Sequence, residues 1–362
     1  MIALKNKEIF DIKLSITTDC FFDCKYCFVK KNKKTMTFAT AKKVIDLVMR
    51  MPPKDKIIRV YGGEPLLYFD LVKKISKYAR QLEKKMRKEL TLTLCTNAFL
   101  LNKNYLDFLK DYDYKLAISI DGKKATHEKY RGFKDKKEDT YKVIQRSVLL
   151  ALKNNSKYNV TAGVGVTPDS VGHLRENLNY ILNMGFDTVN IEPIYGFQNW
   201  GKGKQMIFYQ QMKNIIKFII NQLQKKRFIF LTTINRELKY RTISEFKKGR
   251  CLFYQSMEVN PDGEIGFSSF LINSSNRDKY LIGNINDNVL ERYKNCRYSR
   301  RSQKCRDCIA SYFDFPDATL TEEIVDLRDL LSIEVARFIE KMAEKNKNFA
   351  HYITEAKKHM CL

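Results

Sequence analysis

The sequence has no apolar stretch that approaches the roughly 20 residues needed to span a membrane, and its N-terminus is too polar for a secretory signal. It has no internal repeat and no low-complexity linker, and we recognise no nucleic-acid-binding module in it. Acidic residues are few beside basic ones, with 41 Asp and Glu against 66 Lys and Arg. We therefore expect a cytoplasmic protein that binds neither a membrane nor a nucleic acid.

The composition leaves room for a full core and a second module. Of 362 residues, 44% are hydrophobic and 30% are charged, as in a soluble globular protein. The nine cysteines, in a chain without an export signal, indicate a reducing cytosol and metal ligation rather than disulfides. The net charge of +25 either attracts acidic partners, such as an acidic leader peptide, or reflects the codon bias of an AT-rich genome.

Short β-branched runs alternate with helical stretches up to about residue 225. We predict strands at 10–17, 57–61, 90–96, 114–120, 158–166 and 187–194. Apolar residues at helical spacing predict helices over Ala39–Arg50, Leu71–Lys88, Asn104–Asp111, Thr140–Lys153, Leu174–Met184 and Met206–Lys225. Such alternation predicts an α/β fold, in which helices cover the outer face of a parallel sheet and ligands gather at the carboxyl ends of the strands.

Three cysteines lie in the loop after the first predicted strand. Cys20, Cys24 and Cys27 have the spacing CxxxCxxC. Three thiolates can hold three irons of a [4Fe–4S] cluster and leave the fourth iron open to another ligand. The alternatives are a zinc site, which usually needs a fourth protein ligand that this segment lacks, or scattered free thiols. The spacing favours the cluster.

Further motifs follow the second and fourth predicted strands. In Gly62–Pro65 (GGEP), the glycines let a ligand approach the backbone closely and the carboxylate can accept bonds from an ammonium group. Ser119–Gly122 (SIDG) ends the fourth strand, and His127–Gly132 (HEKYRG) comes soon after. Taken singly, these segments are also typical of ordinary turns and solvated charges. We expect His127 to be a structural or surface histidine.

Together these motifs resemble the signature of the radical S-adenosylmethionine (SAM) superfamily and of its peptide- and protein-modifying branch, which includes the anaerobic sulfatase-maturating enzymes. The resemblance implies a partial (β/α)6 barrel and a [4Fe–4S] cluster whose open iron chelates SAM. It also implies reductive cleavage of SAM to a 5′-deoxyadenosyl radical, which abstracts hydrogen from the substrate. An electron donor such as flavodoxin or ferredoxin is then required.

The resemblance assigns roles to residues of this chain. In the family, the aromatic residue between the cysteines lies beside the adenine, and GGEP holds the SAM amino group. The Ser and Asp approach the ribose, and the Arg approaches the carboxylate. The implied cluster ligands are Cys20, Cys24 and Cys27, and the implied SAM-site residues are Tyr26, Gly62, Gly63, Glu64, Ser119, Asp121 and Arg131.

A second set of cysteines lies after residue 250. They accompany a predicted hairpin turn at Asn260–Ile265 and an Ile282–Ile285 (IGNI) segment. This region resembles the SPASM or Twitch extension, which follows the barrel in peptide-modifying radical SAM enzymes and holds auxiliary iron–sulfur clusters. Four cysteines suffice for one auxiliary [4Fe–4S] cluster, with a zinc knuckle as the alternative. The four are Cys251, Cys296, Cys305 and Cys308.

We accordingly divide the chain into four parts. Residues 1–225 are the radical SAM partial barrel, 226–250 a connection, 251–320 the SPASM/Twitch-like auxiliary cluster region and 321–362 a C-terminal helical tail. The cluster motif begins at Cys20, which leaves no room before it for a leader-binding domain. A leader would therefore dock on the barrel, on the tail or on a separate protein.

Two residues are catalytic candidates. Cys95, at the end of the third strand, is either a hydrogen-atom donor, as an epimerase would need, or a buried hydrophobe. Glu192, at the end of the sixth strand, is a candidate for the substrate or SAM site. In the sulfatase-maturating enzymes a cysteine after the hairpin turn is followed by an aspartate base. Ser269 stands in that place here, which argues against that activity. We expect Cys361 to be a mobile thiol.

We therefore predict an enzyme that modifies a peptide or protein substrate through hydrogen abstraction, followed by cross-linking, epimerisation or oxidation. One alternative is a radical SAM dehydrogenase-type enzyme that acts on a small molecule. The other is a non-catalytic iron–sulfur or zinc-binding protein.

Overall fold

The computed structural model describes residues 11–133, 139–155, 159–194, 197–240, 256–266, 281, 283–286 and 318–358, and from 318 to 326 it describes the backbone alone. Six parallel strands occur in the predicted order, with bounds within two residues of the prediction wherever the predicted end is described. They are β1 (Asp11–Thr17), β2 (Asp55–Gly62), β3 (Glu89–Thr96), β4 (Tyr114–Ser119), β5 (Val160–Val166) and β6 (Thr188–Pro193). The prediction of a parallel α/β sheet is confirmed.

Helices connect these strands and begin where side chains cap them. Thr37 accepts a hydrogen bond from the Thr40 amide at the start of α1, and Asn102 caps α3 in the same way. The short α4 adds one helix to those predicted. The helices are α1 (Phe38–Met49), α2 (Phe69–Met86), α3 (Lys103–Asp111), α4 (Lys124–Tyr130), α5 (Thr140–Asn154), α6 (Leu174–Asn183) and α7 (Lys202–Gln224), with 3₁₀ turns η2 (Pro65–Tyr68) and η3 (Val171–His173).

The strands are apolar on one face and polar on the other, because alternate side chains point to opposite faces. On β1, Ile12, Leu14 and Ile16 join the apolar core together with side chains of the connecting helices. Asp11, Lys13 and Ser15 alternate with them and point to the opposite face, which we call the inner face. The inner face therefore offers polar groups along the strands that carry the predicted motifs.

The sheet does not close into a barrel. Its strand order is β10-β9-β8-β1-β2-β3-β4-β5-β6-β7, and within the described residues its two edge strands do not pair. The added strands are β7 (Phe230–Leu231), β8 (Ser256–Val259), β9 (Glu264–Gly266) and β10 (Gly283–Asn284). β8 pairs with β1 in parallel, and β9 and β10 are antiparallel. This open sheet with its outer helices is the predicted partial barrel.

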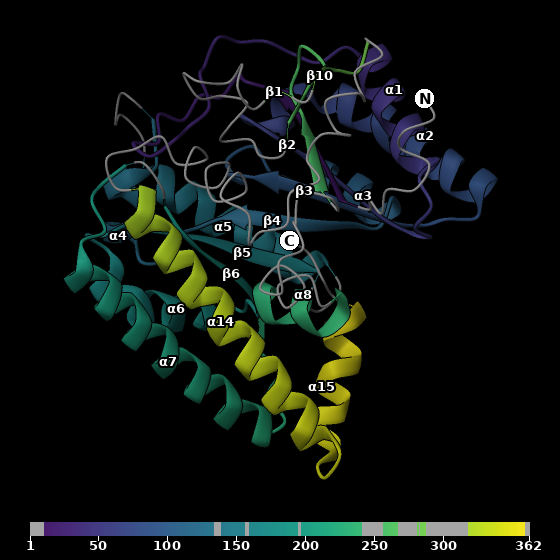
Figure 1. Ribbon diagram of the computed structural model, residues 1–362. Coiled ribbons are helices and arrows are strands. Elements are labelled where there is room, and N and C mark those ends of the chain that lie inside the picture. The colour runs from purple at the N-terminus through teal and green to yellow at the C-terminus, as the bar shows by residue number, and fades with distance from the viewer. Residues whose placement is uncertain are drawn as a thin grey trace.

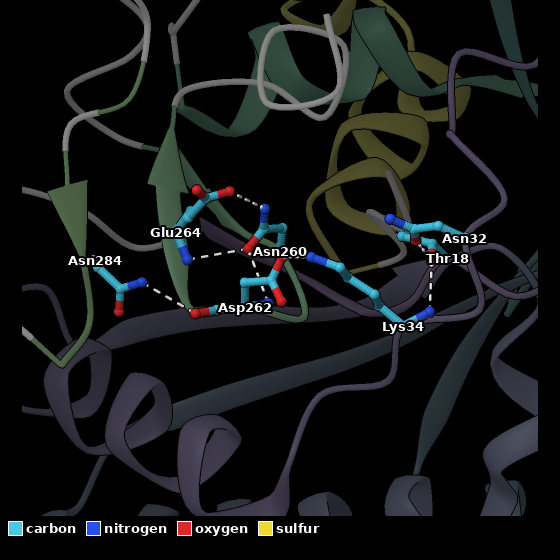
Figure 2. Close-up of polar contacts among 7 residues, drawn as sticks. All are labelled: Thr18, Asn32, Lys34, Asn260, Asp262, Glu264 and Asn284. Carbon is cyan, nitrogen blue, oxygen red and sulfur yellow. Dashed lines mark hydrogen bonds and ion pairs between the residues drawn. The ribbon is translucent and has the colours of Figure 1, made fainter. Parts of the chain in front are cut away.

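The predicted hairpin turn joins β8 to β9 and is confirmed. The side-chain carbonyl of Asn260 accepts from the amides of Asp262 and Glu264, at 3.1 and 3.0 Å. Gly263 turns the chain with φ +82°, a conformation that favours glycine. Asn284, in the predicted Ile282–Ile285 segment, donates to the Asp262 carbonyl at 3.0 Å, so the two predicted segments lie side by side (Figure 2).

Helices from the C-terminal part of the chain pack at the β6–β7 edge of the sheet (Figure 1). α8 (Thr232–Tyr240) and β7 lie within the segment that we expected to be a connection. α14 (Ala318–Ala343) packs against α7 and α8, and α15 (Lys347–Lys358) packs against all three, which confirms the helical tail. In the described part of the chain, none of the helices combines the length and the apolar character required for crossing a bilayer.

Candidate functional site

The three predicted cluster cysteines lie on a loop at the carboxyl end of β1. This loop, residues 18–35, folds back on β1, because the Thr18 amide donates to the Lys34 carbonyl at 2.9 Å. Cys20 and Cys24 are partly buried and Cys27 is exposed. Lys34 also forms an ion pair of 2.6 Å with Asp262 of the β8–β9 turn (Figure 2). The structure thus brings the cysteine loop into contact with the predicted extension.

Four phenylalanine rings form a cluster that packs the cysteine loop against the rest of the protein. Phe21 and Phe22 pack against Phe99 and Phe133, with ring centroids 4.9 to 5.8 Å apart among the four rings. Phe22 is buried, and the amide of the next residue donates to the Gly132 carbonyl at 2.7 Å. Aromatic clusters of this kind fix a loop through buried area and edge-to-face contacts. The two phenylalanines next to Cys20 therefore dock the loop against the segment that carries Arg131.

Gly62 and Gly63 allow the end of β2 to approach the start of the cysteine loop. A Cβ on Gly62 would lie 2.3 Å from the Thr17 carbonyl oxygen, and one on Gly63 would lie 2.1 Å from the Asp19 carbonyl oxygen. The amides of Gly63 and Glu64 donate to these same carbonyls, at 2.7 and 2.8 Å. We predicted that a ligand approaches the backbone at these glycines. In the structure it is the backbone of the cysteine loop that approaches them.

Glu64 is fully buried, and its side chain joins the turn after β2 to the end of β3. Its carboxylate accepts from the Leu66 amide at 3.1 Å, the Thr96 hydroxyl at 2.8 Å and the Asn97 amide at 2.9 Å. Burial raises the pKa of Glu64 to about 7, against the lowering effect of these bonds. A carboxylate has about four acceptor positions, so one is left for a further donor. The assignment of Glu64 to an ammonium group stays a prediction.

Asp121 connects the cysteine loop, α4 and β5. Its Oδ2 accepts from the Tyr26 hydroxyl at 2.5 Å and from Arg131 Nε at 3.0 Å, and its Oδ1 accepts from the Gly165 amide at 2.9 Å. Arg131 also lies over the Tyr26 ring, 5.1 Å from its centroid. The structure therefore brings three predicted SAM-site residues into one contact group at the carboxyl ends of β4 and β5.

His127 is buried beneath this group, which confirms its structural role. Its Nδ1 accepts from the Asp121 amide at 3.3 Å, and its ring lies 5.2 Å from that of Tyr141. Burial lowers the pKa of His127 to about 4, so the imidazole is neutral near pH 7. A neutral imidazole holds the Asp121 backbone without adding a charge beside Arg131.

The thiols suit a cluster because a bound cation would favour their ionised form. Burial raises the pKa of Cys20 to about 12, and burial also raises the pKa of Cys24, which the Arg131 charge opposes. Within the described ranges, no three His, Cys, Asp or Glu side chains are gathered closely enough to hold one metal ion. In a [4Fe–4S] cluster each thiolate binds a different iron, so the three need not converge on one point. The loop therefore fits the cluster that the motif implies.

The remaining predicted residues lie on the inner face. Ser119 ends β4, and its Cα pairs with that of Gly163 on β5. Cys95 is partly buried on β3, two residues before Asn97, whose Nδ2 lies 3.9 Å from Cys20 Sγ. Glu192 forms an ion pair of 2.8 Å with Arg328 of α14. Cys95 and Glu192 therefore flank the site, and their catalytic roles stay predictions.

Some predictions lie outside the described residues. They concern the auxiliary ligands, the residue in the place of the aspartate base and the tail thiol. These residues are Cys251, Cys296, Cys305, Cys308, Ser269 and Cys361.

Sequence reasoning missed Gly165, Asn97 and Arg328. Gly165 lies in a V-G-V run, and the only available signal was a glycine inside a strand, which often marks a close approach. Asn97 directly follows β3, at the strand end where ligands gather in parallel sheets. Arg328 lies in a tail helix that has no motif, so nothing local indicated its contact with β6.

Comparison with known proteins agrees with this geometry. The family model described as the radical SAM superfamily matches residues 14–191. An uncharacterized protein of Methanocaldococcus jannaschii is 29% identical over 279 residues, 76% of this chain and 88% of that protein. A GTP 3′,8-cyclase of Helicobacter pylori is 29% identical over 177 residues, 47% of this chain and 52% of the cyclase. A serine-type anaerobic sulfatase-maturating enzyme of Bacteroides thetaiotaomicron is 28% identical over 158 residues, 40% of this chain and 37% of the enzyme.

Solved structures have the same fold. One of anSMEcpe with bound AdoMet (SAM) and the Cp18Cys peptide has a TM-score of 0.69 at 17% identity, covering 91% of this chain and 99% of that chain. One of Streptococcus suis SuiB bound to the precursor peptide SuiA has a TM-score of 0.59 at 15% identity, covering 83% of this chain and 69% of SuiB. Residues 14–191 are therefore a radical SAM domain, which implies a [4Fe–4S] cluster and SAM as its cofactors.

Proposed function

We propose that this protein is a radical SAM enzyme that modifies a peptide or protein substrate by hydrogen abstraction. The observation that carries the proposal is the docking of the cysteine loop against Asp121 and Arg131. Through it, three thiols, a carboxylate and a guanidinium lie at the carboxyl ends of the parallel strands. Ligands of parallel α/β sheets bind at this end.

The cofactors supply the radical chemistry, since a reduced cluster cleaves bound SAM to a radical that abstracts hydrogen. The chain supplies ligands and orientation. Cys20, Cys24 and Cys27 would hold the cluster. Asp121 and the Tyr26 ring hold the Arg131 guanidinium in place. A guanidinium fixed in this way is suited to bind the carboxylate of SAM. Two contacts fix Asp121 in turn. Its side chain accepts from the Gly165 amide, and its own amide donates to His127.

Three similarities support a peptide or protein substrate. The solved anSMEcpe and SuiB structures contain bound peptides, and a sulfatase-maturating enzyme is among the relatives. The match to the sulfatase-maturating enzyme covers 37% of that enzyme, and the two solved structures are 17% and 15% identical to this chain, so the substrate class is our proposal. The bond that forms after hydrogen abstraction is a cross-link, an epimerised centre or an oxidised side chain.

We also propose that the region after residue 250 holds a second [4Fe–4S] cluster on its four cysteines. The supporting observation is that the predicted hairpin turn and the predicted Ile282–Ile285 segment lie side by side in the antiparallel pairs β8–β9 and β9–β10. The Lys34–Asp262 ion pair connects this turn to the cysteine loop. The division of the chain into barrel, connection, extension and tail belongs to the same proposal.

A small-molecule substrate is the second candidate. The similarity to a GTP 3′,8-cyclase, an enzyme named for a nucleotide, favours it. The cyclase matches 47% of this chain and the sulfatase-maturating enzyme matches 40%, so these similarities do not separate the two substrate classes. GTP is therefore the direct probe for this alternative.

The test is SAM cleavage by anaerobically reconstituted, chemically reduced protein. We expect the wild type to form 5′-deoxyadenosine, and the variant with Cys20, Cys24 and Cys27 all changed to Ala to form none. An iron-loaded wild type that cleaves no SAM would favour the non-catalytic iron–sulfur protein. Consumption of GTP coupled to 5′-deoxyadenosine formation would favour the small-molecule enzyme.

A further inference from the structure

Basic side chains line one level of the inner face of the sheet. The Cα of Lys13 on β1 pairs with that of Arg59 on β2, and Arg59 pairs with Thr93 on β3. Thr93 pairs with Lys115 on β4. Each of these residues alternates with apolar neighbours that belong to the core on the other face. Three of these four side chains are therefore cations on the inner face, and Lys115 among them donates to the Lys358 carbonyl at the end of α15, at 2.7 Å.

Helix α8 crosses this inner face and adds a fourth cation. The Thr232 hydroxyl, at its start, donates to the Asn190 side chain on β6 at 2.5 Å. Arg236, one turn later, is close enough to Asp11, Arg59, Glu192 and Arg328 for their charges to act on it. Burial, followed by the Arg59 charge, lowers the pKa of Arg236. Its guanidinium therefore lies partly buried among charges from both ends of the sheet.

Arg236 differs from the other two arginines in its partners. Arg59 forms a bidentate ion pair with Asp11, with N–O distances of 2.7 and 2.9 Å, and Arg328 pairs with Glu192 at 2.8 Å. Within the described part of the chain, Arg236 makes no hydrogen bond or ion pair. A partly buried guanidinium without an acceptor is unfavourable, so an anion that reaches it gains a charge-assisted bond.

The inner face between Asp121 and Arg236 carries small side chains. Ala117 on β4 and Gly163 on β5 face this side, and a Cβ on Gly163 would meet only the Ile118 carbonyl oxygen within 4 Å, at 3.5 Å. At Gly165 the space is taken by Tyr26, Asp121 and Ile194, so the open stretch begins at Gly163. The Cα of Gly165 pairs with that of Glu192, whose side chain is 40% exposed. An extended ligand can therefore lie on this stretch between the Asp121 contact group and α8.

We propose that Arg236 binds a carboxylate of an acidic peptide that lies along the inner face of the sheet. This inference rests on the proposed function, because it takes the inner face as the path of a peptide substrate. One carboxylate matches the guanidinium of Arg236, which has no hydrogen-bond partner among the described residues. Arg59 and Arg328 already pair with Asp11 and Glu192, so the single guanidinium of Arg236 suits one carboxylate better than the several charges of a triphosphate.

The test is a ligand-observed NMR titration at about 0.15 M salt, where attraction to the basic surface is screened. The probes are the capped pentapeptide Ac-Ala-Ala-Glu-Ala-Ala-NH2 and its Gln counterpart. We expect the Glu peptide to bind the wild type, and Arg236→Gln to weaken it by about tenfold, the loss of one charge-assisted bond. Arg236→Lys keeps the charge but lacks the paired N–H donors of the guanidinium, so its affinity for the Glu peptide should lie between those of the wild type and Arg236→Gln. Arg146→Gln, at an exposed position on α5, is the matched control and should bind as the wild type.

Several results would overturn the inference. They are equal binding of the Glu and Gln peptides, unchanged binding by Arg236→Gln, or no binding of the Glu peptide to a wild type that cleaves SAM. Binding of GTP that depends on Arg236 would overturn it in favour of a phosphate ligand. A wild type that binds the Glu peptide through Arg236 but cleaves no SAM would refute the proposed function and leave the binding inference standing.

Discussion

The Tyr26 hydroxyl donates a hydrogen bond of 2.5 Å to Oδ2 of Asp121, which lies 95 residues later in the sequence. Tyr26 lies between the second and third cysteines of the loop, and Asp121 lies just after β4. The same oxygen accepts from Arg131. One carboxylate therefore holds both the cysteine loop and the guanidinium that we assign to SAM, so changes at Asp121 should affect stability and SAM binding together.

We expect Asp121→Asn to destabilise the fold by about 3 kcal/mol, because it leaves the mostly buried Arg131 without a counter-charge. Urea unfolding measures the loss. SAM affinity, measured by equilibrium dialysis, should fall by about tenfold. Asp107→Asn is the matched control: its ion pair with Lys103 is exposed on α3, so its loss should cost less than about 0.5 kcal/mol. Equal losses for the two variants would contradict the role of Asp121.

Replacing Gly62 by Ala should disrupt the contact between β2 and the cysteine loop. The new Cβ would lie 2.3 Å from the Thr17 carbonyl oxygen, at a φ of +138° that other residues rarely adopt. We expect a loss of about 2 kcal/mol or more in unfolding free energy and less iron after reconstitution. Gly203→Ala, inside α7 with open space around it, should instead be neutral or stabilise by up to about 1 kcal/mol. A Gly62→Ala variant as stable as Gly203→Ala would show that the contact between β2 and the cysteine loop does not require Gly62.

Acid should weaken the fold through His127. Its pKa in the folded protein is about 4, below the ordinary value of 6.5, so the unfolded chain binds more protons between these values. Stability from this residue is therefore complete above about pH 6.5 and is lost as the pH falls toward 4. His127→Asn keeps an acceptor for the Asp121 amide and does not titrate.

Unfolding of the two proteins at several pH values measures this effect. Between pH 7 and pH 4.5 the wild type should lose about 2 to 3 kcal/mol relative to His127→Asn. Other groups titrate in both proteins, so their contribution cancels in the difference. If the unfolding free energies of the wild type and of His127→Asn changed with pH in parallel, burial would not be holding His127 neutral.

Iron content tests the two-cluster proposal. Reconstituted wild type should bind about eight irons, and the triple Cys20, Cys24 and Cys27 to Ala variant about four. Cys95→Ala serves as the control and should keep about eight, since we place Cys95 on β3 outside both ligand sets. A wild type with about four irons that falls to none in the triple variant would make the extension structural or zinc-bound.

The order of strands and motifs could be predicted from local signals. Alternating apolar runs gave all six parallel strands, and each motif follows a strand end, so the sheet brings the motifs together. The hairpin turn between β8 and β9 could also be predicted, because turn residues act locally. The role of Glu64 could not be predicted, because two of its three donors, Thr96 and Asn97, lie at the end of β3, and the pattern alone suggested only an external ammonium group.

The sequence by itself determined that this protein has a parallel α/β sheet, a cysteine loop after its first strand and glycines and carboxylates at later strand ends, because these depend on periodicity and on residue chemistry. Only the tertiary structure decided that Gly165 holds Asp121, that Arg328 reaches Glu192 and that Arg236 lies on the inner face without a hydrogen-bond partner among the residues that the structure describes. Each of these depends on residues that are distant in the chain and meet only when the sheet twists and α8 and α14 pack at its edge. Spacing along the sequence carries no information on such distances.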